Sequence, residues 1–196
     1  MAFSETPASP ETPASPGCAA CGHEHLVEFY ETEEHLIATV AEYLAPALRG
    51  YDAAIVVATG DHRAAFADEM RATGVDVDAA TADGRYQALD AAEILALFMV
   101  DGAPDPALFR QVVARLLERA SFGGREVRVY GEMVALLWAA GDVTSTIALE
   151  DLWNVLGAEH GFSLFCGYPI SGFDVQSRTA FEHICGQHSS VRRPAA

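Results

Sequence analysis

The chain has 196 residues, of which 51% are apolar and 20% are charged, as expected of a single globular domain with a sizeable core. Acidic residues outnumber basic ones by 28 to 12, and an electric field of that sign disfavours nucleic acids and anionic membranes as direct partners. All the basic residues are arginine, which excludes mechanisms that need a lysine, such as a P-loop lysine or a Schiff base.

A proline-rich tail is predicted for residues 1–21, because the motif Glu-Thr-Pro-Ala-Ser-Pro occurs twice there, at 5–10 and 11–16. Such a composition favours a disordered segment that leans towards polyproline II. A single domain is expected over residues 22–191, followed by a disordered end at 192–196.

The domain opens on a short strand that leads into an amphipathic helix. The segment His25-Leu-Val-Glu-Phe-Tyr30 carries the β-branched and aromatic residues that favour a pleated strand. Thr32 is then expected to cap the helix, with glutamates in its first turn, and Gly50 to end it. Further along the chain, hydrophobic periodicity and breaker residues predict the remaining elements. They are strands at 53–58, 86–90, 126–130 and 162–168, and helices at 60–70, 91–100, 105–122, 134–140, 145–160 and 177–189.

Strands that alternate with helices of about ten or more residues imply βαβ units. The predicted fold class is therefore α/β, a three-layer sandwich with a mostly parallel central sheet flanked by helices. In such sheets, ligands bind beyond the carboxyl ends of the strands. The residues expected at those ends are Tyr30, Glu31, residues 59–61, Asp90, Glu132 and Tyr168.

Two clusters of cysteine and histidine raise the question of a metal site. Their members are Cys18, Cys21, His23 and His25 in the first cluster, and His183, Cys185 and His188 in the second. The first falls within eight residues, whereas structural zinc sites usually have two ligand pairs separated by about 12 or more residues. A packed cysteine with surface histidines explains the second more simply. The two clusters can in principle combine across the fold, so the question stays open, and no metal ligand is assigned.

No catalytic constellation emerges from the sequence. Gly131-Glu132-Met133 resembles the position where RecA-type ATPases keep an acidic residue, but no Gly-x-x-x-x-Gly-Lys-Ser/Thr loop accompanies it. Glu132 is therefore expected either to cap the following helix or to accept a hydrogen bond from a ligand. The sequence has no Gly-x-Ser-x-Gly elbow, Cys166 is expected in the core, and Asp61 beside His62 is explained as a helix cap. Neither an enzymatic activity nor a cofactor is predicted.

A cytoplasmic location is expected. No run of about 18 apolar residues is present to span a membrane. The N-terminus shows no basic region followed by an apolar core, as a secretory signal would. Four cysteines without a dense framework fit a reducing compartment better than a disulfide scaffold.

Several segments together resemble the MEDS domain, the methanogen/methylotroph sensory domain. The opening strand with its acidic helix start is one of them. The others are Leu89-Asp-Ala-Ala-Glu93, Phe98-Met-Val-Asp-Gly-x-Pro-Asp105, Gly131-Glu-Met133, Leu149-Glu-Asp-Leu-Trp153, Leu164-Phe-Cys-Gly-Tyr168 and Phe181-x-x-Ile-Cys-x-x-His-Ser189. The resemblance covers roughly residues 22–191 and rests on the order and spacing of these segments.

This resemblance implies a RecA/KaiC-like domain that has lost its ATPase apparatus and senses small organic compounds, including hydrocarbon derivatives. Such domains are often fused to histidine kinases, DNA-binding modules or anti-sigma-type kinase domains. The opening motif of the family is often His-x-Cys-x-x-Tyr. His25 and Tyr30 match it, but Val27 stands at the cysteine position, so no role of that cysteine is transferred. Since the chain has no room for an output domain, the signal is expected to pass to a separate protein.

The sequence is thus interpreted as a non-enzymatic sensory domain that binds a small, largely apolar organic ligand in a crevice at the carboxyl ends of the strands. Its partner protein is expected to be a histidine kinase, an anti-sigma-type kinase or a transcriptional regulator. The ligand-binding residues predicted for this crevice are His25, Phe29, Tyr30, Asp90, Glu132 and Tyr168. The alternatives are a ligand-free protein-interaction scaffold and, less favoured, a residual nucleotide-binding relative of the ATPases.

Overall fold

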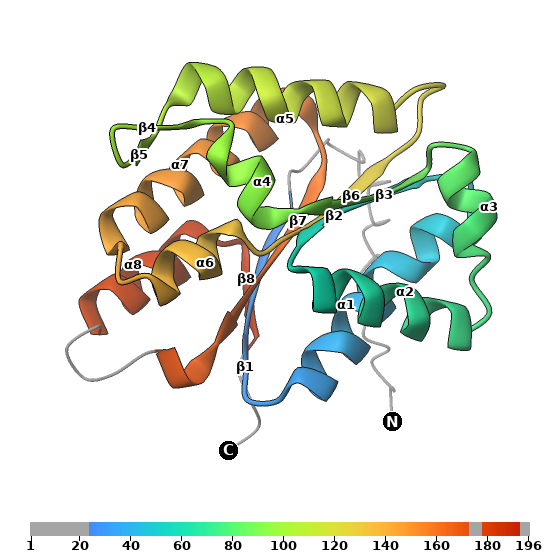
Figure 1. Cartoon of the computed structure of the whole chain (residues 1–196), viewed down its shortest axis with the longest axis horizontal. Helices are drawn as coiled ribbons and strands as arrows, with labels where there is room; N and C mark the ends of the chain where they lie inside the picture. Colours follow the sequence, from blue (N-terminus) through green and yellow to red (C-terminus); the bar gives the residue numbers. More distant parts are fainter. Residues whose placement is uncertain (1–23, 173–177, 193–196) are drawn as a thin grey trace, which may run out of the picture.

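The computed structural model describes residues 24–172 and 178–192. These residues form three layers, with a six-stranded sheet between two layers of helices (Figure 1). The strand order is β3-β2-β6-β7-β1-β8, and every pairing between neighbouring strands is parallel. The predicted α/β three-layer sandwich is therefore confirmed.

The strands of this sheet agree closely with those predicted, apart from a short sixth strand at the C-terminal end. They are β1 His25–Tyr30, β2 Ala53–Ala58, β3 Tyr86–Asp90, β6 Val127–Gly131, β7 Ser163–Pro169 and β8 Ser190–Arg192. The strand β8 was not predicted, and it ends within the segment expected to be a disordered end. It pairs with β1, so the C-terminal part of the described chain lies at the edge of the sheet beside the first strand.

Helices cover the two faces of the sheet in chain order (Figure 1). The first face packs against α1 Glu33–Arg49, α2 Gly60–Ala72 and α3 Val77–Ala82. The second packs against α4 Ala91–Ala96, α5 Pro106–Ala120, α6 Met133–Ala139, α7 Val143–His160 and α8 Arg178–Gln187. A single 3-10 turn, η1 Ile170–Gly172, follows β7.

The side chains of β1 point alternately to the two faces of the sheet, because successive side chains lie on opposite sides of a strand. Val27 and Phe29 belong to the core under α4 to α8, whereas Leu26 and Tyr30 belong to the core under α1 to α3. By the same alternation, His25 faces the side of α4 to α8.

Two predicted helices are shorter than expected. The helix predicted for 91–100 ends at Ala96, because Asp101 and Gly102 adopt positive φ angles of 50° and 84° and make a tight turn. This turn joins β4 Met99–Val100 to β5 Ala103–Pro104 as an antiparallel pair. The final helix ends at Gln187, and the chain then turns back to the sheet.

The cap and the end predicted for the first helix are confirmed. The side chain of Thr32 accepts a hydrogen bond from the His35 amide at 3.3 Å, and Gly50 follows the last turn of α1. Asp105 caps α5 by accepting from the Leu108 amide at 2.8 Å. Asp61 does not cap α2, because Thr59 occupies the N-cap position and Asp61 lies within the first turn.

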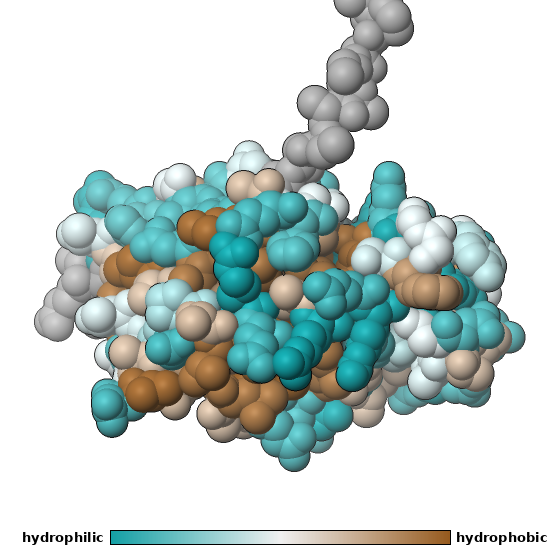
Figure 2. All heavy atoms as spheres, turned by 90° about the horizontal axis from the view of Figure 1, so that it is seen from above, coloured by the Kyte–Doolittle hydropathy of each residue, from teal (hydrophilic) through white to brown (hydrophobic). Residues whose placement is uncertain are grey.

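The outer side of the α5 layer is largely polar, with apolar side chains between the charged ones (Figure 2). On the α4, β4 and α5 side, the exposed apolar residues are Leu97, Val100 and Leu108. Among the described residues, no helix is both long and apolar enough to cross a membrane.

Candidate functional site

A network of carboxylates around one imidazole lies at the carboxyl end of the sheet. Glu132 directly follows β6, and its Oε2 atom accepts a hydrogen bond from the Thr59 amide, at the end of β2, at 2.7 Å. Its other oxygen pairs with Nδ1 of His62, on α2, and Nε2 of His62 pairs with Glu33 in the first turn of α1. We call Glu33, His62 and Glu132 the carboxyl-edge network.

The carboxyl-edge network settles the role of Glu132 within the fold. Glu132 stands at the N-cap position of α6, but its side chain makes no capping hydrogen bond. The expectation that it caps α6 is therefore wrong, because its two oxygens are engaged by Thr59 and His62 instead. Its carboxylate holds the end of β2 and the start of α2 against the end of β6.

The two carboxylates change the acid–base properties of their neighbours. The hydrogen bond to Glu132 raises the pKa of His62 most; burial lowers it, and the charges of Glu132 and Glu33 raise it further, to about 9. Burial, and then the charges of Glu33 and Glu132, raise the pKa of the Tyr30 phenol well above its ordinary value. His62 is thus held as a cation between two anions, and Tyr30 stays a neutral donor.

Asp90 lies next along the same edge of the sheet. It ends β3 and caps α4, since its Oδ1 atom accepts from the Ala92 and Glu93 amides. Its Oδ2 atom accepts a hydrogen bond from Arg63, the neighbour of His62 on α2, at 3.0 Å. Helix α2 therefore carries both cationic side chains that meet the carboxylates of this edge.

The structure divides the six predicted ligand-binding residues into two groups. Tyr30, Asp90 and Glu132 lie along the carboxyl edge of the sheet. Glu132 stands between the other two, since the strands of Tyr30 and Asp90 are separated by β2, β6 and β7. His25, Phe29 and Tyr168 belong to the opposite face, and His25 stands at the amino end of β1. The prediction that one crevice holds all six is wrong, because strand alternation and the length of β1 separate them. Ligand binding by any of them stays a prediction.

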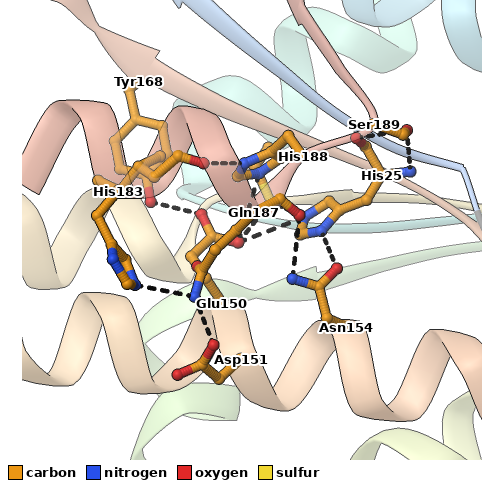
Figure 3. A network of polar contacts seen from close by, with 11 residues as sticks. His25, Glu150, Asp151, Asn154, Tyr168, His183, Gln187, His188 and Ser189 are labelled. Atoms are coloured by element: carbon orange, nitrogen blue, oxygen red, sulfur yellow. Dashed lines mark hydrogen bonds and ion pairs between the residues drawn. The ribbon is translucent and has the colours of Figure 1, made fainter.

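The second group leads to a cluster of buried polar side chains from three elements and the segment after α8 (Figure 3). We call it the buried cluster; its members are His25 on β1, Glu150 on α7, Cys166 on β7 and His188 after α8. One nitrogen, oxygen or sulfur atom of each lies within 4.8 Å of those of the other three. The closest approaches are 3.3 Å from His25 Nε2 to Glu150 Oε2 and 3.4 Å from His25 Nε2 to Cys166 Sγ.

Three of the four members of the buried cluster are held by a neighbour outside it. The Nδ1 atom of His25 lies 2.9 Å from Oδ1 of Asn154, one helical turn after Glu150 on α7. The Nδ1 atom of His188 lies 2.6 Å from the carbonyl oxygen of Ile184. The Tyr168 hydroxyl donates to the second oxygen of Glu150 at 2.6 Å. The orientation of these side chains is therefore fixed (Figure 3).

Burial and neighbouring charges shift the pKa values of the buried cluster, and the two effects oppose each other at Glu150. Burial raises the pKa of Glu150, but the hydrogen bond to His25 and the charges of His188 and His25 when protonated lower it more, so it lies below its ordinary value. Burial and the nearby Glu150 carboxylate raise the pKa of the Cys166 thiol. They do the same to the pKa of the Tyr168 phenol. A carboxylate is thus kept charged in the core beside a neutral thiol and a neutral phenol.

Sequence reasoning missed most of the buried cluster. The side chain of His188 is fully buried, so the expectation that it is a surface histidine is wrong, although Cys185 does pack against the core. Cys166 is buried, as predicted. Glu150 was named only as part of the segment Leu149-Glu-Asp-Leu-Trp153, without a role of its own, and Asn154 was not named. The available signal was that Glu150 falls within the buried stripe of α7, beside Leu149 and Trp153.

The two cysteine and histidine clusters noted in the sequence meet only in part. His25 from the first and His188 from the second lie together, with ring centroids 3.9 Å apart. His183 is exposed. Cys18, Cys21 and His23 lie outside the described residues. The two clusters were considered able to meet across the fold, and the structure confirms that His25 and His188 lie side by side.

A hollow of about 480 Å³ lies at the opposite, amino end of the sheet. It is lined by Asp83, Gly84, Glu118, Arg119, Phe122 and Arg125. Asp83 and Gly84 precede β3, and Arg125 precedes β6. This hollow is therefore separate from the carboxyl-edge network.

Comparison with known proteins agrees with the resemblance seen in the motifs. The model of the MEDS family, described as the MEthanogen/methylotroph, DcmR Sensory domain, matches residues 24–188. No curated protein matches this chain. The matched region includes the carboxyl-edge network and all four members of the buried cluster. Because it spans most of the sequence, the chain belongs to the MEDS family of sensory domains.

Proposed function

We propose that this chain is a non-enzymatic, cytoplasmic sensory domain that binds a small, largely apolar organic ligand and signals to a separate protein. Membership of the MEDS family supports the sensory role. The observation that carries the proposal is the carboxyl-edge network, in which His62 lies between Glu33 and Glu132. In open α/β sheets this edge is where ligands bind.

The chemistry of this edge disfavours the alternative of a residual nucleotide-binding protein. The loop between β1 and α1, where a phosphate would be cradled, carries Glu31, and the first turn of α1 adds Glu33 and Glu34. The chain contains no lysine, and Arg63 is already paired with Asp90. A triphosphate entering there would meet carboxylates of its own sign, and charge repulsion of this kind costs binding energy.

The same chemistry suits a ligand whose polar end donates a hydrogen bond. Carboxylate oxygens only accept hydrogen bonds, whereas the Tyr30 phenol, which keeps its proton, can donate one. A small alcohol meets both requirements and keeps an apolar body for the buried surface beside Tyr30. In this proposal Tyr30 and Glu132 contact the ligand. Asp90 does not, because β2, β6 and β7 lie between its strand and that of Tyr30, and His25, Phe29 and Tyr168 do not either.

The signal requires an element whose position depends on the ligand. Helix α2 fits this role, because His62 and Arg63 connect it to carboxylates on three other segments. A ligand that engages Glu132 competes with the contact between Glu132 and His62 and favours a shifted α2. The partner that would respond is a histidine kinase, an anti-sigma-type kinase or a transcriptional regulator. The net charge of −16 disfavours direct contact with nucleic acid.

The test is a thermal-shift and calorimetric screen of small alcohols, ketones, halocarbons and nucleotides against the purified chain. We expect at least one of the organic compounds to raise the melting temperature and nucleotides to have no effect. Glu132→Gln should weaken the binding of that compound. Glu159→Gln is the matched control, since Glu159 is partly exposed and pairs with Arg110 on the helical surface far from this edge.

Three outcomes contradict the proposal. Binding of none of the compounds favours the ligand-free interaction scaffold, which pull-down of partners in the absence of any ligand would support. ATP turnover that Glu132→Gln abolishes favours the nucleotide-binding alternative. Binding that Glu132→Gln and Glu159→Gln weaken equally removes the carboxyl-edge network from the ligand site.

A further inference from the structure

The distances within the buried cluster match those between the ligands of a tetrahedral metal ion. With zinc bonds of about 2.0–2.1 Å to nitrogen or oxygen and about 2.3 Å to sulfur, the ligand atoms are expected about 3.3–3.6 Å apart. The Nε2 atom of His25 lies 3.3 Å from Glu150 Oε2 and 3.4 Å from Cys166 Sγ. The Nε2 atom of His188 lies 3.5 Å, and Cys166 Sγ 3.8 Å, from the same oxygen of Glu150.

Hydrogen bonds on the far side of each ring orient the histidines as metal ligands. The Nδ1 atom of His25 faces Oδ1 of Asn154, and Nδ2 of Asn154 donates to the carbonyl oxygen of Gln187 at 3.1 Å. The Nδ1 atom of His188 faces the carbonyl oxygen of Ile184. Carbonyl oxygens only accept hydrogen bonds, so both Nδ1 atoms carry a proton. In the neutral rings, the lone pairs of both Nε2 atoms then point towards Glu150 and Cys166.

The carboxylate is oriented in the same way. Glu150 directs Oε2 at His25, His188 and Cys166, and its other oxygen accepts from the Tyr168 hydroxyl. Metal-binding carboxylates and imidazoles are commonly held by such outer hydrogen bonds, which fix the ligand and raise its basicity. Asn154, Ile184 and Tyr168 supply them here.

Charge balance also favours a cation at this place. The side chain of Glu150 is fully buried, and a buried carboxylate is costly unless it is paired or binds a metal. Its contacts in the described residues come from two imidazoles, a thiol and a phenol, none of which has a permanent positive charge. A divalent cation at the centre would balance the carboxylate together with a Cys166 thiolate.

From this geometry we propose that His25, Glu150, Cys166 and His188 form a closed binding site for a zinc ion. Two nitrogens, one oxygen and one sulfur suit zinc, which accepts all three donor types in tetrahedral geometry. Because the protein supplies all four ligands, the site is structural and leaves no open position for catalysis. The inference is independent of the proposed ligand at the carboxyl-edge network.

The site would fasten the C-terminal segment to the sheet. His188 lies between α8 and β8, and the neighbouring Ser189 already exchanges hydrogen bonds with the backbone of His25. A zinc ion bound to His25 and His188 adds a direct link between the start of β1 and the end of α8. Its loss should therefore loosen residues 184–192 more than the rest of the domain.

Metal analysis of the purified full-length chain is the first test. We expect about one equivalent of zinc per chain, and at least about 100-fold weaker zinc binding in Cys166→Ser and in His188→Ala. Cys185→Ser is the matched control, because Cys185 packs against the core outside the buried cluster; it should bind zinc as the wild type does. The double variant Cys18→Ser/Cys21→Ser should also keep its zinc. Loss of zinc in either of these two controls overturns the proposal.

Two measurements on the wild-type chain cover the case in which a variant fails to fold. X-ray absorption spectroscopy should show one sulfur and three nitrogen or oxygen atoms around the zinc; two or more sulfur ligands, or none, overturn the proposal. Cobalt(II) substitution should give the visible bands of a tetrahedral ion with a thiolate charge-transfer band. Failure to bind zinc or cobalt at all would mean that protons alone fill the buried cluster, and would overturn it too.

Hydrogen–deuterium exchange separates this site from any other zinc site. After removal of zinc with a chelator, exchange should rise in residues 184–192 and at the start of β1. Helices α2 and α3, on the other face of the sheet, should exchange as before. Zinc removal without faster exchange in residues 184–192 contradicts the proposal.

Discussion

The Nδ1 atom of His62 is hydrogen-bonded to the carboxylate of Glu132, and the other oxygen of that carboxylate accepts a hydrogen bond from the Thr59 amide. Glu33 engages the other nitrogen of the same ring. An imidazole whose two nitrogens each donate a hydrogen bond to a carboxylate is stabilised as a cation. This is why the pKa of His62 rises to about 9. The ends of β2 and β6 and the starts of α1 and α2 are thus joined through one titratable group.

The first prediction concerns the pH dependence that follows from this pKa. The folded state binds the proton of His62 more tightly than the unfolded state, whose histidine has a pKa of about 6.5. The resulting stability is fully present below about pH 6.5 and is lost as the pH rises through about 9. We expect His62→Gln to lower the free energy of unfolding at pH 6 by about 1–2 kcal/mol.

The measurement is chemical denaturation of the wild type and His62→Gln at pH 6, 7.5 and 9.5. The difference between the two proteins should shrink towards the highest pH, because the wild-type ring loses its proton there. Other groups that titrate over the same pH range contribute equally to the stability of both proteins, so their contribution cancels in the difference. A difference that stays constant from pH 6 to pH 9.5 would show that His62 is not held as a cation.

The second prediction tests the role of Glu132 as a link between strands. Glu132→Gln keeps an oxygen that can accept from the Thr59 amide, whereas Glu132→Ala leaves that amide without its acceptor. We expect Glu132→Ala to destabilise the protein by about 1–3 kcal/mol more than Glu132→Gln does. Both variants should lower the pKa of His62, which NMR titration of its ring would record. Equal stability of the two variants would contradict the link to Thr59.

Local patterns predicted the elements whose formation depends on neighbouring residues in the chain. The strand His25–Tyr30 and the helix that Thr32 caps follow from alternation and a capping side chain. The strand β8 could not be predicted in this way, because its three residues depend on pairing with β1. The prediction of a helix over 91–100 was wrong at its C-terminal end. There the Asp101-Gly102 turn places Met99 and Val100 in a short strand despite the apolar periodicity.

The candidate sites show the same division. Tyr30, Asp90 and Glu132 could be predicted to lie at one edge, because the carboxyl ends of parallel strands share that edge. The separation of His25 from them follows from the strand period, which places it on the other face and at the other end. The meeting of Glu150, Cys166 and His188 with His25 depends on how α7 and the segment after α8 pack on the sheet, which no local pattern encodes.

The third prediction concerns the hydrogen bond that positions Glu150. Tyr168→Phe removes the hydroxyl that donates to Glu150 Oε1 at 2.6 Å and keeps the ring in place. Because a hydrogen bond to a buried charged group is among the stronger kinds, we expect a loss of about 1.5–3 kcal/mol in the free energy of unfolding. Tyr51→Phe is the matched control, since Tyr51 is 73% exposed, and it should change stability little. Similar effects of the two substitutions in denaturant unfolding would argue against the bond to Glu150.

The last prediction concerns the close packing at Gly167 in β7. A Cβ atom at this position would lie 2.9 Å from the Tyr130 hydroxyl oxygen and 3.1 Å from Cδ1 of Leu36. These contacts are shorter than van der Waals packing allows, so Gly167→Ala should destabilise the protein by about 1–3 kcal/mol. Gly186→Ala is the control, because within the described residues no atom beyond its chain neighbours and the backbone of its own helix lies within 4 Å of the new methyl group. As a change from glycine to alanine within α8, it should stabilise the protein by up to about 1 kcal/mol.

A double variant identifies the atom responsible for the clash at Gly167. The Tyr130 hydroxyl is buried and makes no hydrogen bond within the described part of the chain, so Tyr130→Phe alone should cost little or even stabilise the fold. Combined with Gly167→Ala, it removes the nearest atom to the new methyl group and should restore part of the lost stability. Thermal and denaturant unfolding of the four proteins give the coupling energy between the two positions. Strict additivity would mean that Leu36, and not the Tyr130 hydroxyl, limits the space at Gly167.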